Sequence, residues 1–376
     1  MPHTVAIQPD QLTHKNGEKQ SFSSRWAVRA AETGVNVRSV NVHAPDFFEQ
    51  LAGCDGFMWR FGYSPTPRLF AKRLLPAIEH GLGMPVFPSF ETAWHFEDKI
   101  AQSYLLQAAG FPTPATWVFW DRTNALEFCR SATYPMVLKL SFGYQSANVR
   151  LLNSFDDASS WIARLFGAGV TGLRPPAPQW RDALHRARGA LRHLRGASAV
   201  EDLDYSELQH GYFYVQEFVP GNEYDIRVTV IGNRAFAFRR FNRPGDFRAS
   251  GSGRIDWNPD QIDQEGVRLA FRVARRLQTQ SLAVDLLQNG GRQLLTEISY
   301  TYASWAVRDC PGHWVQDGDG DEGRLSWVDG GMHPEDAIFD DFVARLRSRD
   351  ATILPASLAP HLPVEQQFAP FLDAEV

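Results

Sequence analysis

Two acidic residues interrupt apolar, strand-like runs on either side of a short turn, and this hairpin constrains the fold more than any other feature of the chain. Asp285 lies in the run at residues 281–287, Glu297 lies in the run at residues 293–299, and Asn289-Gly290-Gly291 joins the two runs. A turn with an Asn-Gly pair between two such runs favours an antiparallel hairpin. The sequence therefore predicts that two carboxylates lie on one small sheet.

The register of the hairpin decides how close the two carboxylates come. With three loop residues, Asp285 would face Leu295, and Glu297 would be its diagonal neighbour on the same face, about 7–8 Å away. Two acids on one half-buried surface would push one pKa up unless a cation lies between them. Mg²⁺ prefers oxygen ligands and usually arrives with substrate phosphates. The alternative is a pair of solvated charges on the open face of an antiparallel sheet, and the hairpin alone does not decide between the two.

Length and composition exclude several classes of protein. A chain of 376 residues suggests two or three domains. With 38 basic and 43 acidic residues the net charge is −5, which argues against a general binder of nucleic acid or of anionic membranes. The three cysteines, Cys54, Cys129 and Cys310, stand far apart without metal-binding spacing, which favours a reducing compartment. With no signal-like start and no membrane-length apolar stretch, we expect a soluble, cytoplasmic protein.

Hydrophobic periodicity divides the chain into three parts. Short strands alternate with helices over residues 1–93, which predicts a small open α/β layer. Asp98 is a predicted N-cap for a helix over 99–109, and strands dominate again from residue 212. Residues 158–210 are rich in arginine and are interpreted as an insertion, whose charged helical face is expected to be solvated rather than phosphate-binding.

Lysine is rare in this chain, so each lysine that remains is informative. The basic residues are 33 arginines and only five lysines. A site that needs a compact ammonium rather than a planar fork would retain lysine, which makes Lys99 and Lys139 candidates, although chance survival on a surface is an equal alternative. Lys139 ends an alternating strand just before a loop of small and hydroxyl residues at 141–148, a setting that suits phosphates.

A second candidate segment follows the strand that ends at Pro220. A strand that stops there would leave backbone groups of Glu217 and Val219 unpaired and open to a purine edge, with Glu223 placed to accept from ribose hydroxyls. Asp225 and Arg227 alternate with apolar residues, so they share the polar face of the next strand, where we expect them to pair.

Several arginines crowd the strand and loop that come next, and a cluster of this kind suits a site that handles several negative oxygens. They are Arg239, Arg240, Arg243 and Arg248.

Taken in order, these pieces resemble the ATP-grasp superfamily, and within it the ligases that join amines to carboxylates, such as the ribosomal-protein glutamate ligases and D-alanine ligases. No single motif is specific, whereas the order and the separations are. The motifs are Asp98-Lys99, Gly-Phe-Pro-Thr-Pro at 110–114, Lys139 before its loop, Gln-Glu-Phe-Val-Pro-Gly-Asn-Glu at 216–223, Asp-Ile-Arg-Val at 225–228, Val-Asp-Leu-Leu at 284–287, and Leu-Thr-Glu-Ile-Ser at 295–299.

The resemblance implies an α+β protein with the ATP-grasp fold, in which two α+β subdomains clasp ATP behind a small open α/β domain. The implied boundaries are 1–93 for the N-terminal domain, 94–218 and 219–350 for the two subdomains, and 351–376 for a C-terminal tail, with the insertion at about 158–210 inside the first subdomain.

The resemblance also implies ATP and Mg²⁺ as cofactors and divides the site among three groups of residues. The implied ATP-binding residues are Lys99, Lys139, Gln216, Glu217, Val219 and Glu223. The implied metal ligands are Asp285, Glu297 and Ser299. The arginines expected to serve catalysis are Arg239, Arg240 and Arg248.

The implied activity is ATP-dependent activation of a small-molecule carboxylate as an acylphosphate, followed by transfer to an amine. Neither nucleic acid nor membrane insertion is expected, a homodimer is left open, and surface-polysaccharide or natural-product biosynthesis is the pathway suggested. Two positions depart from the pattern: Ser299 stands where relatives commonly have Asn, and Ala283 stands where several have Arg. A kinase of the same fold and a nucleotide-binding module without catalysis therefore stay as alternatives.

Overall fold

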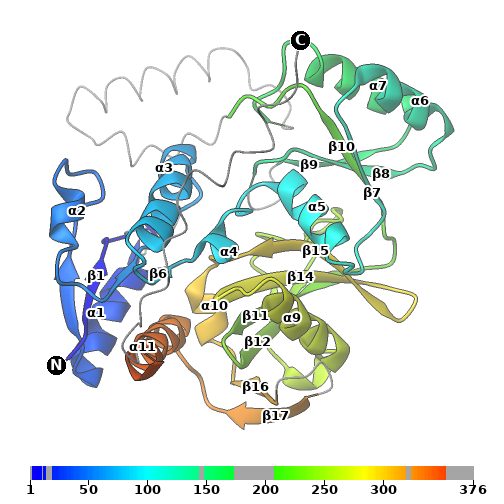
Figure 1. Ribbon diagram of the computed structural model, residues 1–376. Coiled ribbons are helices and arrows are strands. Elements are labelled where there is room, and N and C mark those ends of the chain that lie inside the picture. Colours follow the sequence, from blue (N-terminus) through cyan, green and yellow to red (C-terminus); the bar gives the residue numbers. More distant parts are fainter. Residues whose placement is uncertain are drawn as a thin grey trace, which may run out of the picture.

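The computed structural model describes residues 2–10, 12–13, 19–143, 148–172, 207–318 and 323–352, which form three α/β layers (Figure 1). The first layer is a parallel sheet in the order β4-β1-β5-β6. Its strands are β1 (Thr4–Ile7), β4 (Asn36–Ser39), β5 (Gly56–Met58) and β6 (Val86–Phe87). Its other elements are the β2 (Leu12–Thr13) and β3 (Lys19–Gln20) pair, the helices α1 (Phe22–Thr33), α2 (Phe47–Gln50) and α3 (Pro65–Pro76), and a π-helical turn at Ala77–Gly81.

The second layer is an antiparallel sheet in the order β7-β10-β8-β9, with two helices packed against it. Its strands are β7 (Thr116–Phe119), β8 (Met136–Lys139), β9 (Val149–Leu152) and β10 (Phe213–Glu217). The helices are α6 (Arg122–Ser131) and α7 (Phe155–Leu165). Because α7 contributes Trp161 and Ile162 to the core of this layer, residues 158–165 belong to it and not to the predicted insertion, while residues 173–206 lie outside the described residues.

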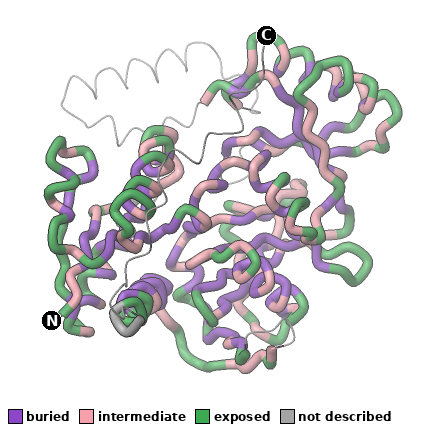
Figure 2. The backbone as a smooth tube through the Cα atoms, in the orientation of Figure 1, coloured by how far each residue is buried: buried purple, intermediate pink, exposed green. Residues whose placement is uncertain are grey.

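The third layer is the largest sheet, in the order β15-β14-β11-β12-β16-β17, with β13 paired to β12. Its strands are β11 (Tyr224–Ile231), β12 (Arg234–Phe241), β13 (Ile255–Asp256), β14 (Ser281–Asn289), β15 (Arg292–Ser299), β16 (Gly312–Asp317) and β17 (Arg324–Asp329). The 3₁₀ turn η2 (Pro259–Gln261) leads into α9 (Gln264–Arg276), whose apolar face packs on these strands, and α10 (Ser304–Arg308) follows β15. The inner strands are buried along most of their length (Figure 2).

The last helix, α11 (Pro334–Thr352), returns to the first layer and joins it to the third (Figure 1). Arg25 and Arg29 of α1 pair with Asp336 and Asp340 of α11. Gly56 is required in this packing, because a Cβ there would lie 2.7 Å from the ring of Phe342. The first and third layers therefore share one core. No helix among the described residues is long and apolar enough to cross a membrane.

Two short helices connect the first layer to the other two, α4 (Phe90–Ala93) and α5 (Lys99–Ala108). Asp98 caps α5 through a hydrogen bond from the backbone N–H of Ala101 to its side chain at 3.0 Å, as predicted from the sequence. Gln102 of α5 accepts a hydrogen bond from the backbone N–H of Ile298 at 3.3 Å. The helix is thus held against β15, and its first residue, Lys99, is carried to the edge of the third sheet.

Candidate functional site

The β14–β15 hairpin places the two acidic residues closer together than the sequence predicts. Gly290 and Gly291 both have positive φ, 55° and 82°, which is the conformation of a two-residue hairpin loop. A bulge after Asp285 shifts the register, so that Asp285 lies directly opposite Glu297 rather than opposite Leu295. The predicted diagonal register is therefore wrong, because the loop is shorter than assumed and β15 carries one extra residue at Thr296.

Two arginines hold Asp285 in place. Arg227 donates from Nε to Oδ1 and from Nη2 to Oδ2 of Asp285, both at 2.7 Å, and Arg240 Nη2 lies 2.8 Å from Oδ2. Arg240 also forms a two-point pair with Asp225 at 2.7 and 2.6 Å. The expected pairing of Asp225 with Arg227 is thus wrong, because both side chains face the neighbouring strands, Arg227 toward β14 and Asp225 toward β12.

Asp225, Arg227, Arg240 and Asp285 form a quartet of paired charges, and burial has a strong effect on the pKa values of its two carboxylates. Burial raises the pKa of Asp285, but the guanidinium groups of Arg227 and Arg240 outweigh it and hold that pKa well below its usual range. For Asp225 burial dominates instead and raises the pKa, with Arg240 opposing the rise. Asp285 is therefore ionised at neutral pH, and its charge is balanced by arginine in this structure.

Glu297 is paired with Lys99 across the two layers. Lys99 Nζ lies 3.1 Å from Glu297 Oε1 and donates to the carbonyl oxygen of Gly143 at 2.6 Å. Burial alone would lower the pKa of Lys99, but Glu297 and the buried Glu97 raise it above its ordinary value. Lys99 therefore stays charged and ties β15 to residues 141–143, the first residues of the predicted phosphate loop, of which 144–147 lie outside the described residues.

Lys139 lies beside these groups but is not neutralised by them. Its side chain is 8% exposed, and its ammonium makes no hydrogen bond or ion pair with the part of the chain that the structure describes. Burial lowers its pKa to about 8, with Glu297 opposing the shift and Lys99 adding to it. An ammonium in this position, close to Glu297 and Asp285 but in direct contact with neither, could bind an anionic ligand.

The proton equilibrium of Lys139 gives a testable prediction. A polyphosphate bound at this ammonium would stabilise its charged form and raise the pKa from about 8 toward the ordinary lysine value. Nucleotide binding at pH 8 should therefore take up on the order of half a proton, and affinity should fall as the pH rises from 7 to 9. Calorimetric titration with ADP and Mg²⁺ in buffers of different ionisation enthalpy measures this uptake.

Two substitutions sharpen that measurement. Lys139→Arg retains a permanent charge, so it should bind nucleotide without proton uptake, whereas Lys139→Met should both weaken binding and abolish the uptake. An unchanged uptake in Lys139→Met would show that another group takes the proton.

The predicted adenine-contacting segment is found at the end of β10, but one of its backbone groups is already used. The N–H of Glu217 donates to the carbonyl oxygen of Ala115 at 2.8 Å, so the expectation that it is unpaired is wrong. Gln216 is buried and donates from Nε2 to the hydroxyl of Thr116 at 2.9 Å. Val219 is buried just beyond the strand, and Glu223 is exposed at the start of the following hairpin.

The remaining predicted residues lie in different surroundings. Arg239 is on the opposite face of β12 from Arg240 and pairs with Asp256. Arg248 pairs with Asp246 at 2.6 Å and donates to the carbonyl oxygen of Val149 at 3.2 Å, which bridges two layers. The structure thus brings one of the three predicted catalytic arginines, Arg240, to the acidic pair, and a catalytic role for the other two stays a prediction.

Arg227 was missed as a site residue, although a signal was present. The alternation in Asp-Ile-Arg places its side chain on the same sheet face as Asp285 one strand away.

Ser299 lies two residues beyond Glu297, and its hydroxyl donates to the carbonyl oxygen of Thr301 at 2.7 Å. Among the residues that the structure describes, no group of three or more His, Cys, Asp or Glu gathers into a metal cluster.

Comparison with known proteins identifies the fold. Residues 198–303 match the family described as RimK-like ATP-grasp domain. The solved structure of the ATP-grasp ligase PsnB with a minimal precursor superposes with a TM-score of 0.53 at 14% identity, covering 92% of this chain and 99% of that one. D-alanine–D-alanine ligase from Bacillus anthracis superposes with a TM-score of 0.50 at 10% identity, covering 94% and 100%. The chain has the ATP-grasp α+β fold, as predicted.

Among curated proteins, the chain is similar to the alpha-aminoadipate–LysW ligase LysX of Saccharolobus solfataricus, with 24% identity over 218 residues. The match covers 57% of this chain and 65% of that relative, slightly less than two thirds of its length. LysX, PsnB and D-alanine–D-alanine ligase are all named as ligases.

Proposed function

We propose that the protein is an ATP-dependent ligase that activates a carboxylate and joins it to an amine. The observation that carries the proposal is Lys139, which is 8% exposed, lies near Glu297 and Asp285, and forms no ion pair with the described residues, so that a polyanion could bind its ammonium. The similarity to ligases of the ATP-grasp superfamily supports the choice of nucleotide and of reaction.

The donor set at the hairpin fits Mg²⁺. Asp285 and Glu297 are directly opposed carboxylates, and Oδ1 of Asp285 accepts one hydrogen bond from the described residues, which leaves a lone pair for a metal. Ser299 lies two residues from Glu297 and offers a hydroxyl oxygen. When bound, Mg²⁺ would neutralise phosphate charge and polarise the transferred phosphoryl group. For Glu297 to bind the metal, Lys99 would have to give up part of its contact with that carboxylate. We interpret the position of Lys99, between Glu297 and the loop that begins at Ser141, as suited to this exchange.

The cleft residues have distinct roles in the proposed reaction. Lys139 and Lys99 hold the phosphates, Arg240 and Arg227 fix the orientation of Asp285, and the end of β10 with Val219 and Glu223 holds adenine and ribose. Gln216 and Glu217 support this segment through their bonds to β7 and to Ala115 rather than by direct contact. Positioning and charge neutralisation account for most of the catalysis in such phosphoryl transfers.

The proposed reaction balances in two steps. An oxygen of the substrate carboxylate attacks the γ-phosphorus of ATP, the bond to ADP breaks, and an acylphosphate forms. The amine nitrogen then attacks the carbonyl carbon, phosphate leaves with the C–O bonding electrons, and the ammonium loses its proton to give the amide.

The test is turnover with defined substrates. Purified protein with ATP and Mg²⁺ should release ADP and phosphate only when a carboxylate and an amine from a substrate panel are both present. ADP release with no amine requirement and a phosphorylated product would indicate the kinase alternative. Absence of turnover across the panel, together with ADP binding, would indicate a nucleotide-binding module and would overturn the proposal.

A further inference from the structure

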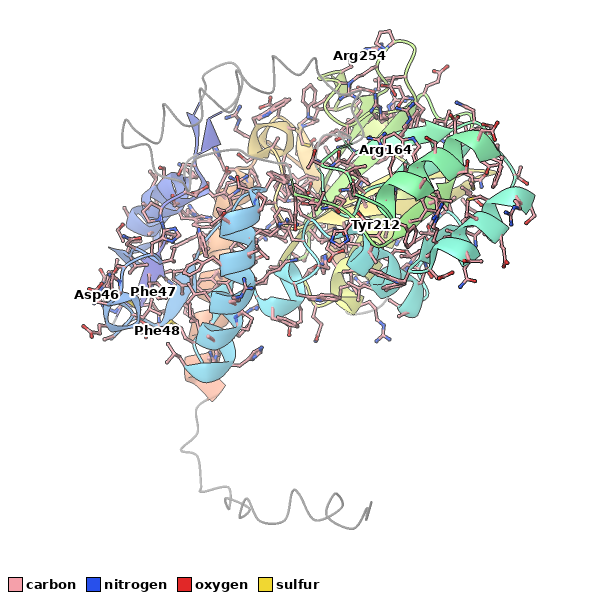
Figure 3. All side chains as sticks on the ribbon, turned by 90° about the horizontal axis from the view of Figure 1, so that it is seen from above. Asp46, Phe47, Phe48, Arg164, Tyr212 and Arg254 are labelled. Carbon is pink, nitrogen blue, oxygen red and sulfur yellow. The ribbon has the colours of Figure 1, made fainter. Side chains whose placement is uncertain are left out.

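An open surface cavity lies on the side of α5 that faces residues 207–212. Its volume is about 390 Å³, within the range of small-molecule sites. It is lined by α5, by the end of β7, and by the segment that leads into β10. Tyr212, labelled in Figure 3, belongs to this last segment.

Aromatic side chains form one wall of the cavity. Trp120 and Tyr104 both line it and are 61% and 46% exposed. They are held in a fixed arrangement, because Trp120 Nε1 donates to the hydroxyl of Tyr104 at 2.8 Å, and the ring of Tyr212 lies 6.0 Å from that of Trp120. Single exposed rings are common on protein surfaces, but rings linked in this way form a preorganised platform.

The charged groups of the lining are acidic. Asp98 and Glu207 line the cavity, and no lysine or arginine does so among the described residues. Glu207 Oε2 pairs with Arg68 at 2.5 Å, while Oε1 has no hydrogen bond to the described part of the chain. A ligand that brings its own positive charge would match two carboxylates and could place that charge over an aromatic face.

Ser141 connects the lining of the cavity to the loop that the sequence predicts to bind phosphates. Ser141 donates from its hydroxyl to Asp98 Oδ1 and from its N–H to the hydroxyl of Tyr212, both at 2.8 Å. Its carbonyl oxygen accepts from the N–H of Lys99 at 2.9 Å. Ser141 therefore belongs to the cavity and also begins the segment whose Gly143 contacts Lys99 Nζ.

We propose that this cavity binds a small organic cation, a protonated amine on a stem of several carbons, and that its occupancy is coupled through Ser141 to nucleotide binding in the cleft. The stem lies against Trp120 and Tyr104, and the ammonium is balanced by Asp98 and Glu207. The site is separate from the ligase chemistry proposed above, so it is tested by binding and not by turnover.

Binding is measured by calorimetric titration of the full chain with three probes of equal length, 1,5-diaminopentane, 1,5-pentanediol and glutarate. The diamine should bind saturably and the other two should not. Trp120→Ala and Glu207→Gln should each weaken diamine binding at least about fivefold, and added salt should weaken it further. Phe48→Ala is the matched control, because Phe48 is 52% exposed and lies far from Tyr212 in Figure 3.

Three results would overturn the proposal: no saturable diamine binding, equal binding of the diol, or diamine binding that neither Trp120→Ala nor Glu207→Gln changes. Coupling is measured separately as the affinity for ADP with Mg²⁺ in the presence and absence of saturating diamine, and the diamine affinity must change by the same factor when ADP is added. Equal ADP affinities in the two conditions would overturn the coupling through Ser141.

Discussion

Arg240→Met is expected to lower the free energy of unfolding by about 3–5 kcal/mol, the usual cost of removing one partner from a buried ion pair. Arg240 bonds Asp225 through two nitrogens and also contacts Asp285, and all three side chains are at most 13% exposed. Methionine fills a similar space but leaves Asp225 buried without a cation. Chemical denaturation of the purified variant measures the loss.

The loss should depend on pH in a defined direction. In the variant, burial without Arg240 raises the pKa of Asp225 further, so folding is destabilised at pH values above that pKa and recovers as protonation neutralises the group. The difference from the wild type should therefore shrink from pH 7 toward pH 4.5. Adding Asp225→Asn to Arg240→Met should recover part of the stability, because Asp285 keeps Arg227.

A surface pair provides the control for this experiment. Arg308→Met removes an ion pair with Asp309 whose side chains are 46% and 42% exposed, and its effect should be below about 1 kcal/mol. A loss in Arg240→Met as small as in this control would show that the quartet around Asp285 is solvated or that its charges are not balanced by Arg240.

The hairpin shows how far sequence reasoning reaches at this site. Alternating apolar residues and the Gly290-Gly291 turn indicate that Asp285 and Glu297 share one face, and the structure confirms that they do. The direct opposition of the two acids depends on the bulge at Thr296, whose hydroxyl donates to the carbonyl oxygen of Asp285 at 3.1 Å. A single extra residue in a strand leaves no periodic signal in the sequence. It shifts only the pairing register of the residues that follow it in the strand.

The sequence also does not predict which carboxylate each arginine pairs with, and the reason is a different one. A sequence shows that Asp225, Arg227 and Arg240 lie on polar faces, but the choice of partner depends on which strands are adjacent in the sheet. In the order β15-β14-β11-β12, β11 lies between β14 and β12, so Arg227 reaches Asp285 and Asp225 reaches Arg240. Long-range strand order of this kind is not encoded by local pattern.

The elements whose signals are local were predicted well. The N-cap at Asp98 and the strand that ends at Lys139 both occur where the sequence indicates. By contrast, β16 and β17 were not predicted, although they extend the third sheet at its edge. Their polar and apolar residues alternate only weakly. Their position in the sheet is set by the pairing of β16 with β12, which is distant in the sequence, and of β17 with β16.

Asp285→Asn and Glu297→Gln should each reduce kcat/KM for the ligase reaction on the order of 10²–10³-fold, the usual effect of removing one preorganised electrostatic group. The two variants should differ in how they fail. Asp285→Asn keeps the shape of the side chain but leaves Arg227 and Arg240 without that anion, so turnover and stability should both fall. Glu297→Gln releases Lys99 from its ion pair, so the loss should be found mainly in turnover and in the Mg²⁺ requirement.

Asp256→Asn is the matched control, because Asp256 also pairs with an arginine of β12, Arg239, on the other face of the same sheet. Initial rates measured against the concentrations of ATP and of Mg²⁺, with folding checked by circular dichroism, distinguish a lost metal ligand from a misfolded cleft. If Asp285→Asn folds and turns over as fast as Asp256→Asn, Asp285 serves only to anchor Arg227 and Arg240. The metal would then have to be held by Glu297 and the phosphates alone.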